Sequence, residues 1–167
     1  MLDFSIVKVY KLSIYLITIL SISCRNMPSE NDMPPFKLLL MDSVTTFSSE
    51  NIPNGQPSLL LYFSPECEHC QSQIKNLLIN IPKLNHVGIY LISNDPFDQI
   101  RLLNTCYHLS DYSNIMVGRD YKFGFFNYYK PKSTPYLFVF NSHKRIKKIF
   151  VGDVDVKEII KQVNALF

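Results

Sequence analysis

One stretch of the sequence predicts a strand, a turn and a helix in direct succession. The run LLLYF, residues 59–63, is continuously apolar, as in a strand that is buried on both faces. Cys67 and Cys70 follow it in the sequence FSPECEHC. From Cys70 onward, apolar residues recur at helical spacing until Pro82 closes the segment: Ile74, Leu77, Leu78 and Ile81. A helix that directly follows a buried strand is typical of an α/β domain.

The remaining chain alternates in the same way. Further strands are expected at 36–41, at 87–92, near Ile115, and as an antiparallel hairpin at 136–141 and 145–151. Helices are expected after SNDP (93–96), within 117–129, and along the apolar stripe from Val156 to Leu166. This order predicts an α/β fold with a central mixed β-sheet flanked by helices on both faces.

Composition favours one globular unit without a nucleic-acid partner. The chain has 167 residues, of which 47% are hydrophobic, enough for a substantial core. Its net charge of +3 is small and its lysines are scattered, so no nucleic-acid footprint is visible. The basic stretch HKRIKK, 143–148, is interpreted as a solvated hairpin turn rather than a binding patch.

The N-terminus has the pattern of a secretion signal. Lys8 and Lys11 precede an uncharged run, 12–23, which ends in LSISC and is followed by a polar stretch rich in Asn, Ser and Pro. The run is shorter than the about 20 residues that a spanning helix needs. We therefore expect a signal peptide at 1–23, a tether at 24–35 and one domain at 36–167.

Cys24 makes this segment similar to a bacterial lipoprotein signal, in which cleavage before the cysteine leaves it to carry lipid. Ser21 stands where Leu is usual in such signals. The resemblance implies export to the cell envelope or periplasm and a lipid anchor in the membrane. An ordinary cleaved signal, a retained anchor and a buried N-terminal segment remain alternatives. In an oxidising compartment, Cys67 and Cys70 are the natural pair.

The position of Cys67 favours redox chemistry. At a strand-to-helix junction, the unpaired amide groups and the positive end of the helix stabilise a thiolate. A thiol with a pKa of about 8.5 is about 3% ionised at pH 7, whereas one with a pKa of about 7 is half ionised. Cys70, one turn into the helix, can reach back to Cys67 and resolve a mixed disulfide. Cys67 should therefore be open and Cys70 shielded.

Three stretches together resemble the thioredoxin-like superfamily, in particular the exported, membrane-tethered thiol-disulfide oxidoreductases of the TlpA/ResA type. They are LLLYFSPECEHC, KSTPYLFVF (132–140) and KKIFVGDVDVKEIIKQV (147–163), and the resemblance covers 36–167. It implies a thioredoxin-like fold, thiol- or disulfide-containing protein partners and a membrane electron-donor protein. It also implies that the redox-active disulfide Cys67–Cys70 works without another cofactor.

The resemblance further implies a cis bond before Pro135, with that proline against the cysteine pair. The backbone of Thr134 would then be free to pair with an extended substrate. A trans proline that opens an edge strand is the alternative.

The chain departs from the family pattern where acids are expected. Leu61 stands where many thioredoxins have a buried acid, Gln73 where TlpA/ResA-type proteins often have Glu, and Lys75 replaces a common proline. The usual proton acceptor is absent from both places. Either water or one of the exposed residues around the motif, Glu66, Glu68 or His69, should substitute for it, or turnover should be slow.

Glu68 and His69 lie between the cysteines and should tune their redox potential. A histidine there resembles the strongly oxidising exported enzymes because its ring stabilises the thiolate, whereas Glu68 opposes this by repulsion. A solvated His69 without a catalytic part is the alternative. Potentials of such proteins span about −270 to about −120 mV, so two residues do not decide a value.

Other cysteines, histidines and aromatics carry weaker signals. A structural zinc site needs four ligands, and His86, His108 and His143 are isolated, so no metal site is predicted. A non-catalytic or copper-handling lipoprotein with this fold remains the alternative function. Cys106 is expected to be a half-buried small hydrophobe, with an intermolecular or regulatory thiol as the alternative. The aromatic residues at 121–129 are expected to pack in the core or form a partner surface.

Overall fold

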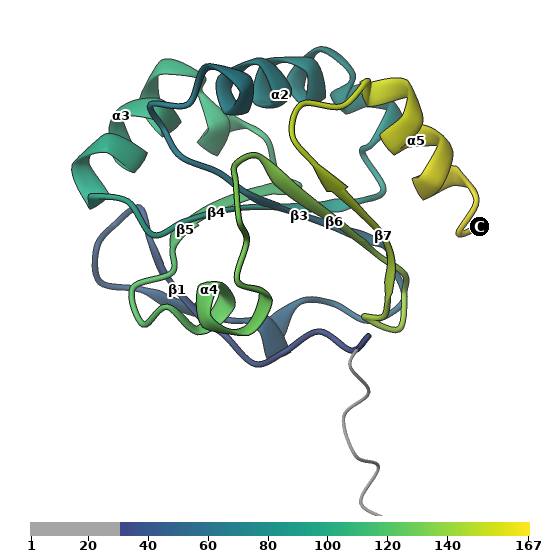
Figure 1. The fold of residues 1–167 in the computed structure, drawn as a ribbon, viewed down its shortest axis with the longest axis horizontal. Helices are drawn as coiled ribbons and strands as arrows, with labels where there is room; N and C mark the ends of the chain where they lie inside the picture. Colours follow the sequence, from purple (N-terminus) through teal and green to yellow (C-terminus); the bar gives the residue numbers. More distant parts are fainter. Residues whose placement is uncertain (1–30) are drawn as a thin grey trace, which may run out of the picture. The chain divides into compact units, whose positions relative to one another are not determined.

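A seven-stranded mixed sheet forms the centre of the computed structural model, which describes residues 31–167 (Figure 1). The strand order is β2-β1-β5-β4-β3-β6-β7. β3, β4 and β5 run parallel, and every other neighbouring pair is antiparallel. The strands are β1 (Lys37–Leu40), β2 (Thr46–Ser48), β3 (Ser58–Tyr62), β4 (Gly88–Ser93), β5 (Ile115–Arg119), β6 (Tyr136–Phe140) and β7 (Ile146–Val151).

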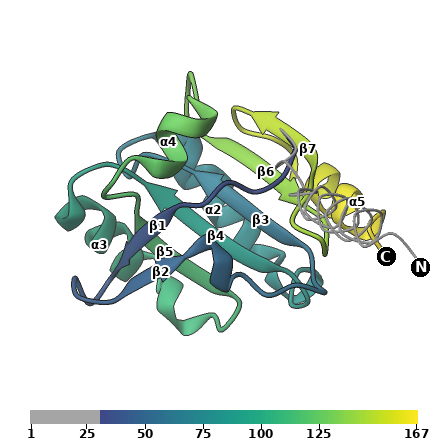
Figure 2. The same cartoon turned by 90° about the horizontal axis from the view of Figure 1, so that it is seen from below.

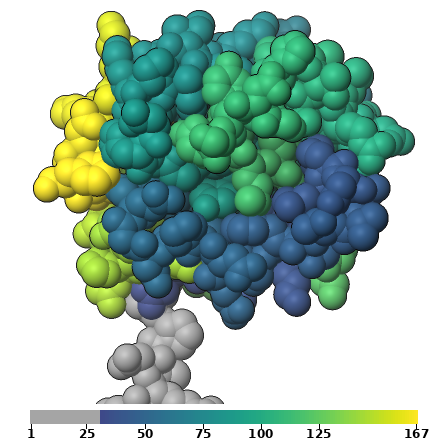
Figure 3. Space-filling view, turned by 180° about the vertical axis from the view of Figure 1, so that it is seen from behind, coloured from purple at the N-terminus to yellow at the C-terminus, as the bar shows by residue number. Residues whose placement is uncertain are grey.

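Helices cover both faces of this sheet, as predicted. α2 (Glu68–Ile79), α3 (Phe97–Cys106) and α5 (Val156–Asn164) lie on one face, and α4 (Gly124–Tyr129) lies on the other (Figure 1). Seen from behind, α5 and the region of α3 stand at opposite sides of the molecule (Figure 3). Short 3-10 turns occur at η1 (Ser49–Asn51), η2 (Ile81–Lys83) and η3 (Leu109–Asp111).

The side chains of β3 alternate between two hydrophobic clusters. Leu59, Leu61 and the adjoining Phe63 pack under α2, α3 and α5. Leu60 and Tyr62 pack on the opposite face in a second cluster. All five residues of β3 are buried, which is why the strand is continuously apolar from Leu59 onward. Because a fully buried Leu contributes about 1.5–3 kcal/mol, this strand is a main source of stability.

The aromatic segment supplies the second cluster, so the predicted core packing is confirmed for part of it. Phe125 is fully buried, and its ring lies 5.4 Å from that of Phe36 and 5.3 Å from that of Phe138. The buried Asp120 accepts hydrogen bonds from the backbone N–H groups of Gly124 and Phe126, at 2.9 Å each. This carboxylate therefore holds the first turn of α4 against the sheet.

Helix and strand boundaries differ from the predictions in two places. The short edge strand β2 was not expected, because three residues carry too little periodicity to predict a strand. It pairs with β1 alone, from which a turn separates it in the chain. Helix α2 begins at Glu68, with Cys67 as its N-cap at the predicted strand-to-helix junction, but it ends before the position expected from Pro82. It ends at Ile79, and Pro82 lies in the 3-10 turn η2 beyond it.

The described part of the chain begins at Asn31, and its first residues contact the β6–β7 hairpin. The carbonyl of Asn31 accepts from the N–H of Ile146 at 2.8 Å, and the N–H of Met33 donates to the carbonyl of Lys144 at 3.0 Å. From this hairpin, the chain crosses the α4 face of the sheet to reach β1 (Figure 2). Residues 31–35 of the expected tether thus pack against the domain.

Several predictions for the N-terminus lie outside the described residues. These are the signal peptide at 1–23, the lipid attachment at Cys24 and the tether up to residue 30. Among the helices of residues 31–167, none is both long and apolar enough to cross a membrane.

Candidate active site

Cys67 lies at the beginning of α2, where backbone N–H groups have no partner within the helix. Its sulfur accepts a hydrogen bond from the N–H of Cys70 at 3.3 Å, and its backbone carbonyl accepts from the N–H of Gln71 at 3.0 Å. The strand β3 ends at Tyr62, and the N–H of Phe63 still donates to the carbonyl of Ile92. The predicted order of strand, turn and helix therefore places a sulfur at the positive end of a helix.

The two sulfurs differ in burial, as their expected roles require. Cys67 is half-buried, whereas Cys70 is fully buried in the cluster beneath α2. Both are free thiols in this structure, as is Cys106. An incoming disulfide can therefore reach Cys67 but not Cys70.

The surroundings push the pKa values of the two thiols in opposite directions. Partial burial acts to raise the pKa of Cys67, but hydrogen bonds from Cys70, from the Thr134 side chain and from the His69 backbone outweigh it, so the pKa is lowered. Burial, together with the hydrogen bond to Cys67, raises the pKa of Cys70 to about 12. Cys67 is thus the thiol that ionises first, and Cys70 remains protonated until it reacts.

The loop before β6 lies against the cysteines. The carbonyl of Thr134 accepts a hydrogen bond from the Cys67 thiol at 3.7 Å, although the two residues are 67 positions apart. The bond between Thr134 and Pro135 is cis, as the family resemblance implied. The carbonyl of Pro135 is itself engaged, because it accepts from the N–H of Gly152 at 2.8 Å. Docking of a substrate at these two residues stays a prediction.

Glu68 and His69 are the first two residues of α2, and both are exposed. The structure therefore places their side chains at the same helix end as the Cys67 sulfur. The backbone of His69 contributes a hydrogen bond that lowers the pKa of Cys67. Tuning by the two side chains stays a prediction.

Gln73 is a site residue whose structural role was not foreseen. It is 1% exposed, and its Oε1 accepts from the N–H of Val154 at 2.8 Å, which connects α2 to the loop before α5. Its buried Nε2 has no hydrogen-bond partner among the described residues. One signal could have revealed it, because Gln73 shares the helical stripe of Cys70, Ile74 and Leu77. Leu61 is fully buried in the core, so neither expected position supplies an acid.

Cys106 is exposed, and the expectation of a half-buried residue is wrong. It is the last residue of α3, which buries Ile100, Leu103 and Asn104. At 100° per residue, Cys106 lies outside this buried stripe. It faces a groove beside the active site instead.

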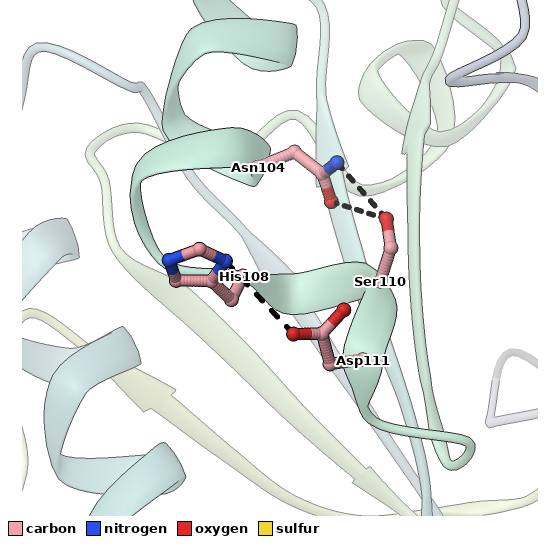
Figure 4. A network of polar contacts seen from close by, with 4 residues as sticks. All are labelled: Asn104, His108, Ser110 and Asp111. Atoms are coloured by element: carbon pink, nitrogen blue, oxygen red, sulfur yellow. Dashed lines mark hydrogen bonds and ion pairs between the residues drawn. The ribbon is translucent and has the colours of Figure 1, made fainter.

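His86 and His108 make their contacts away from the cysteine pair. The ring of His86 packs against Phe167 with 4.9 Å between centroids, and His108 Nδ1 lies 3.9 Å from Asp111 Oδ2 at the surface (Figure 4). In the part of the chain that the structure describes, no three His, Cys, Asp or Glu side chains converge on a possible metal position.

Known proteins match this chain through structure rather than through sequence. The sequence matches no protein-family profile and no curated protein. The structure resembles DsbF from MTB with a TM-score of 0.68 and 15% identity, covering 85% of this chain and 100% of that one.

Two further solved structures give the same picture. A secreted Mycobacterium tuberculosis disulfide oxidoreductase, homologous to E. coli DsbE, matches with a TM-score of 0.66 and 16% identity over 78% of this chain and 96% of that one. StoA from Bacillus subtilis matches with a TM-score of 0.62 and 14% identity over 78% and 97%. The chain therefore has the thioredoxin-like fold, with its cysteine pair at the beginning of α2.

Proposed function

We propose that this protein is a thiol-disulfide oxidoreductase of the cell envelope that exchanges disulfides with partner proteins through Cys67 and Cys70. One observation carries the proposal. A half-buried thiol with a lowered pKa lies at a helix N-terminus, and a buried thiol whose pKa is raised to about 12 follows one turn later. This is the asymmetry that an attacking and a resolving cysteine need.

The exchange proceeds in two balanced steps. The Cys67 thiolate attacks a substrate disulfide and forms a mixed disulfide, while the departing substrate sulfur takes the electron pair of the broken bond and a proton from solvent. Cys70 then loses its proton and attacks the Cys67 sulfur, which releases the second substrate thiol. The substrate gains two electrons, and the protein is left with a Cys67–Cys70 disulfide. The reverse sequence oxidises a dithiol.

The redox-active disulfide needs no dissociable cofactor, since the electrons are held by the two sulfurs. The proton of Cys70 must still leave, and Leu61 and Gln73 cannot accept it. We assign this role to water, or to one of the exposed groups around the motif: Glu66, Glu68 and His69.

Substrate docking is proposed at Thr134 and Pro135. The contact between the Thr134 carbonyl and the Cys67 thiol supports this, because a backbone paired with Thr134 lies beside the attacking sulfur. Glu68 and His69, at the same helix end, are proposed to tune the redox potential.

Export and membrane tethering rest on the N-terminal sequence. We propose that Cys24 carries lipid and that a membrane electron-donor protein recycles the cysteine pair. One structural neighbour is named as a secreted disulfide oxidoreductase, which is consistent with an exported protein.

The reduction potential of the cysteine pair tests the proposed activity. The full chain is equilibrated with glutathione or dithiothreitol buffers, alkylated, and read by mass. We expect a reversible two-electron couple between about −270 and about −120 mV. The variant Cys106→Ser should keep this couple, because Cys106 is not part of the pair. A Cys67–Cys70 pair that does not cycle under any buffer would overturn the proposal.

A further inference from the structure

The segment 121–132, which contains α4, has a buried side and an exposed side. Phe125 is buried in the second hydrophobic cluster, whereas Phe123 is 43% exposed and Tyr128 is 47% exposed. The segment contains no Asp or Glu, so its charged side chains are all of one sign. We call its exposed aromatic and basic residues the α4 surface: Lys122, Phe123, Tyr128, Lys130 and Lys132.

Both ends of α4 have an unusual backbone. Phe123 precedes the helix and Lys130 follows it, and both lie in the left-handed region, with φ values of 55° and 46°. Residues with large side chains rarely adopt this conformation, so the surrounding structure must hold it. The N–H of Phe123 donates to the carbonyl of Asp120 at 3.0 Å, and the carboxylate of this buried residue holds the first turn of α4. The α4 surface is therefore fixed relative to the sheet.

The same face of the sheet has further exposed apolar side chains, on the edge strand β7. Ile149 is 38% exposed and Val151 is 59% exposed, and they lie opposite Phe138 and Tyr136 of β6. Residues directly opposite each other point to the same face, and this is the face of the second cluster. A row of rings connects β6 to α4, because Tyr129 lies 4.3 Å from Phe138, which lies 5.1 Å from Tyr136.

The described chain also begins on this side of the molecule. From the β6–β7 hairpin, residues 31–36 cross the α4 face, where the ring of Phe36 lies 5.4 Å from that of Phe125 (Figure 2). Cys24, the proposed site of lipid attachment, precedes Asn31 by seven positions. Since an extended chain spans at most about 3.6 Å per residue, a lipid on Cys24 would keep Asn31 within about 25 Å of the membrane.

We propose that the α4 surface binds the headgroup region of an anionic membrane beside the lipid anchor. The inference rests on the tethering proposed for Cys24 and adds a second contact to it. Lysines are attracted to anionic headgroups, and exposed aromatic rings favour the boundary between headgroups and acyl chains. Stable anchoring of a lipidated protein commonly combines the lipid with a basic surface.

A membrane fits this surface better than a protein partner does. The anchor holds lipid near the α4 face at all times, so the second contact forms at a high effective concentration. Helices α2, α3 and α5 lie on the opposite face of the sheet (Figure 1). The contact therefore leaves α2, with Cys67 at its beginning, on the face that points away from the lipid and toward soluble partner proteins.

A single tryptophan tests the contact directly, because the chain has none of its own. In the full chain, Phe123→Trp places an indole on the α4 surface. Ile79→Trp is the matched control, since Ile79 is exposed at the end of α2 on the opposite face. Each protein is reconstituted into vesicles of phosphatidylcholine and phosphatidylglycerol whose phosphatidylcholine is brominated near the headgroup end of its acyl chains. Flotation shows that the protein is on the vesicles, and bromine quenches an indole that it contacts.

We expect strong quenching and a blue-shifted emission for Phe123→Trp, and neither for Ile79→Trp. Replacement of Lys122, Lys130 and Lys132 by Gln should abolish the quenching. So should 1 M salt, where the screening length is about 3 Å instead of about 10 Å at 0.1 M. A control with the same change of charge should keep the quenching, because its exposed lysines lie on α2 and α5: Lys75, Lys157 and Lys161, each replaced by Gln.

Three outcomes would overturn the inference. Equal quenching of the two reporters, or none at position 123 of a floating protein, would reject the contact and leave the tethering standing. Quenching that persists in pure phosphatidylcholine vesicles and in the Lys122, Lys130 and Lys132 variant would reject recognition of anionic lipid. A chain that does not float with vesicles would reject the tethering and the inference together. The Cys67–Cys70 couple is measured separately, so none of these outcomes decides the proposed redox activity.

Discussion

At the scale of single residues, the two cysteines divide the chemistry because their surroundings differ. Cys67 collects hydrogen bonds at an open helix end, and these stabilise its thiolate. Cys70 lies among apolar side chains that disfavour its charged form. The beginning of α2 therefore holds Cys67, which ionises first, and Cys70, which stays protonated.

Removal of the Cys70 thiol should weaken the acidity of Cys67. In Cys70→Ala the thiol hydrogen bond is lost but the backbone N–H remains, so the pKa of Cys67 should rise toward its ordinary value. The rate of alkylation by iodoacetamide as a function of pH, read at Cys67 by mass, measures this. Because the pKa of Cys67 is lowered in the wild-type protein, its alkylation rate should rise at a lower pH than the rate of a free thiol, whose pKa is about 8.5. Superimposable curves for the two proteins would contradict the prediction.

Gln73 offers a second residue-scale prediction, because it lies one turn after Cys70 on the buried side of α2. In Gln73→Glu, one oxygen can still accept from Val154, and the other replaces the unpaired Nε2. A carboxylate three residues after Cys70 lies next to it on the same helix face and can accept its proton. We expect the collapse of a preformed mixed disulfide to become at least about tenfold faster.

The collapse rate is measured by rapid mixing of the Cys67 mixed disulfide and quenching in acid. Gln73→Leu, which adds no base, is the control and should show no acceleration. An equal rate in Gln73→Glu and in the wild-type protein would show that proton removal from Cys70 does not limit the step.

At the scale of elements, regular patterns were predictable and contacts between distant segments were not. Strand β3, the β6–β7 hairpin and α5 carry strong periodicity, and each lies close to its predicted position. Strand β2 is too short to carry such a signal. The placement of Cys67 at a helix end followed from the local sequence. The link between Gln73 and Val154, 81 residues apart, and the groove beside α3 depend on tertiary packing.

Helix α5 permits a direct test of such local signals. The Asp155 side chain accepts from the N–H of Lys157 at 2.9 Å and caps the helix. Asp155→Ala should lower the free energy of unfolding by about 1 kcal/mol, as measured with urea. Asp153→Ala changes an exposed aspartate two residues earlier, which does not cap the helix, and should have a smaller effect. Equal losses in both variants would mean that the cap contributes nothing specific.

At the scale of the whole molecule, two neighbouring inner strands, β3 and β6, bring distant parts of the chain to the cysteine pair. Cys67 follows β3 at the centre of the sheet, whereas Thr134 leads into β6. The buried Asp120 anchors α4, and the chain passes from α4 directly to Thr134. The second hydrophobic cluster, on the face opposite α2, therefore supports the loop that contacts the attacking sulfur.

The segment before β1 should belong to this cooperative unit. Residues 31–35 connect the β6–β7 hairpin to β1 through the bonds of Asn31 and Met33, and the Ser49 hydroxyl donates to the carbonyl of the buried Pro34 at 3.0 Å. Three such hydrogen bonds at about 1 kcal/mol each contribute about 3 kcal/mol. A chain that starts at Phe36 should therefore unfold at lower urea concentration than one that starts at Asn31.

The comparison uses equilibrium unfolding of both chains in the reduced state, and a similar denaturant slope for both means that a shift of the midpoint reports a change in stability. A double substitution, Met33→Gly with Pro34→Gly, in the longer chain should give an intermediate midpoint, because it removes side-chain packing but keeps the backbone bonds. If all three midpoints coincide, residues 31–35 lie on the domain without stabilising it. The residues that contribute to the free energy of unfolding then begin at the predicted boundary, residue 36. A lower midpoint for the shorter chain instead makes these residues a structural part of the fold that holds Cys67 against Thr134.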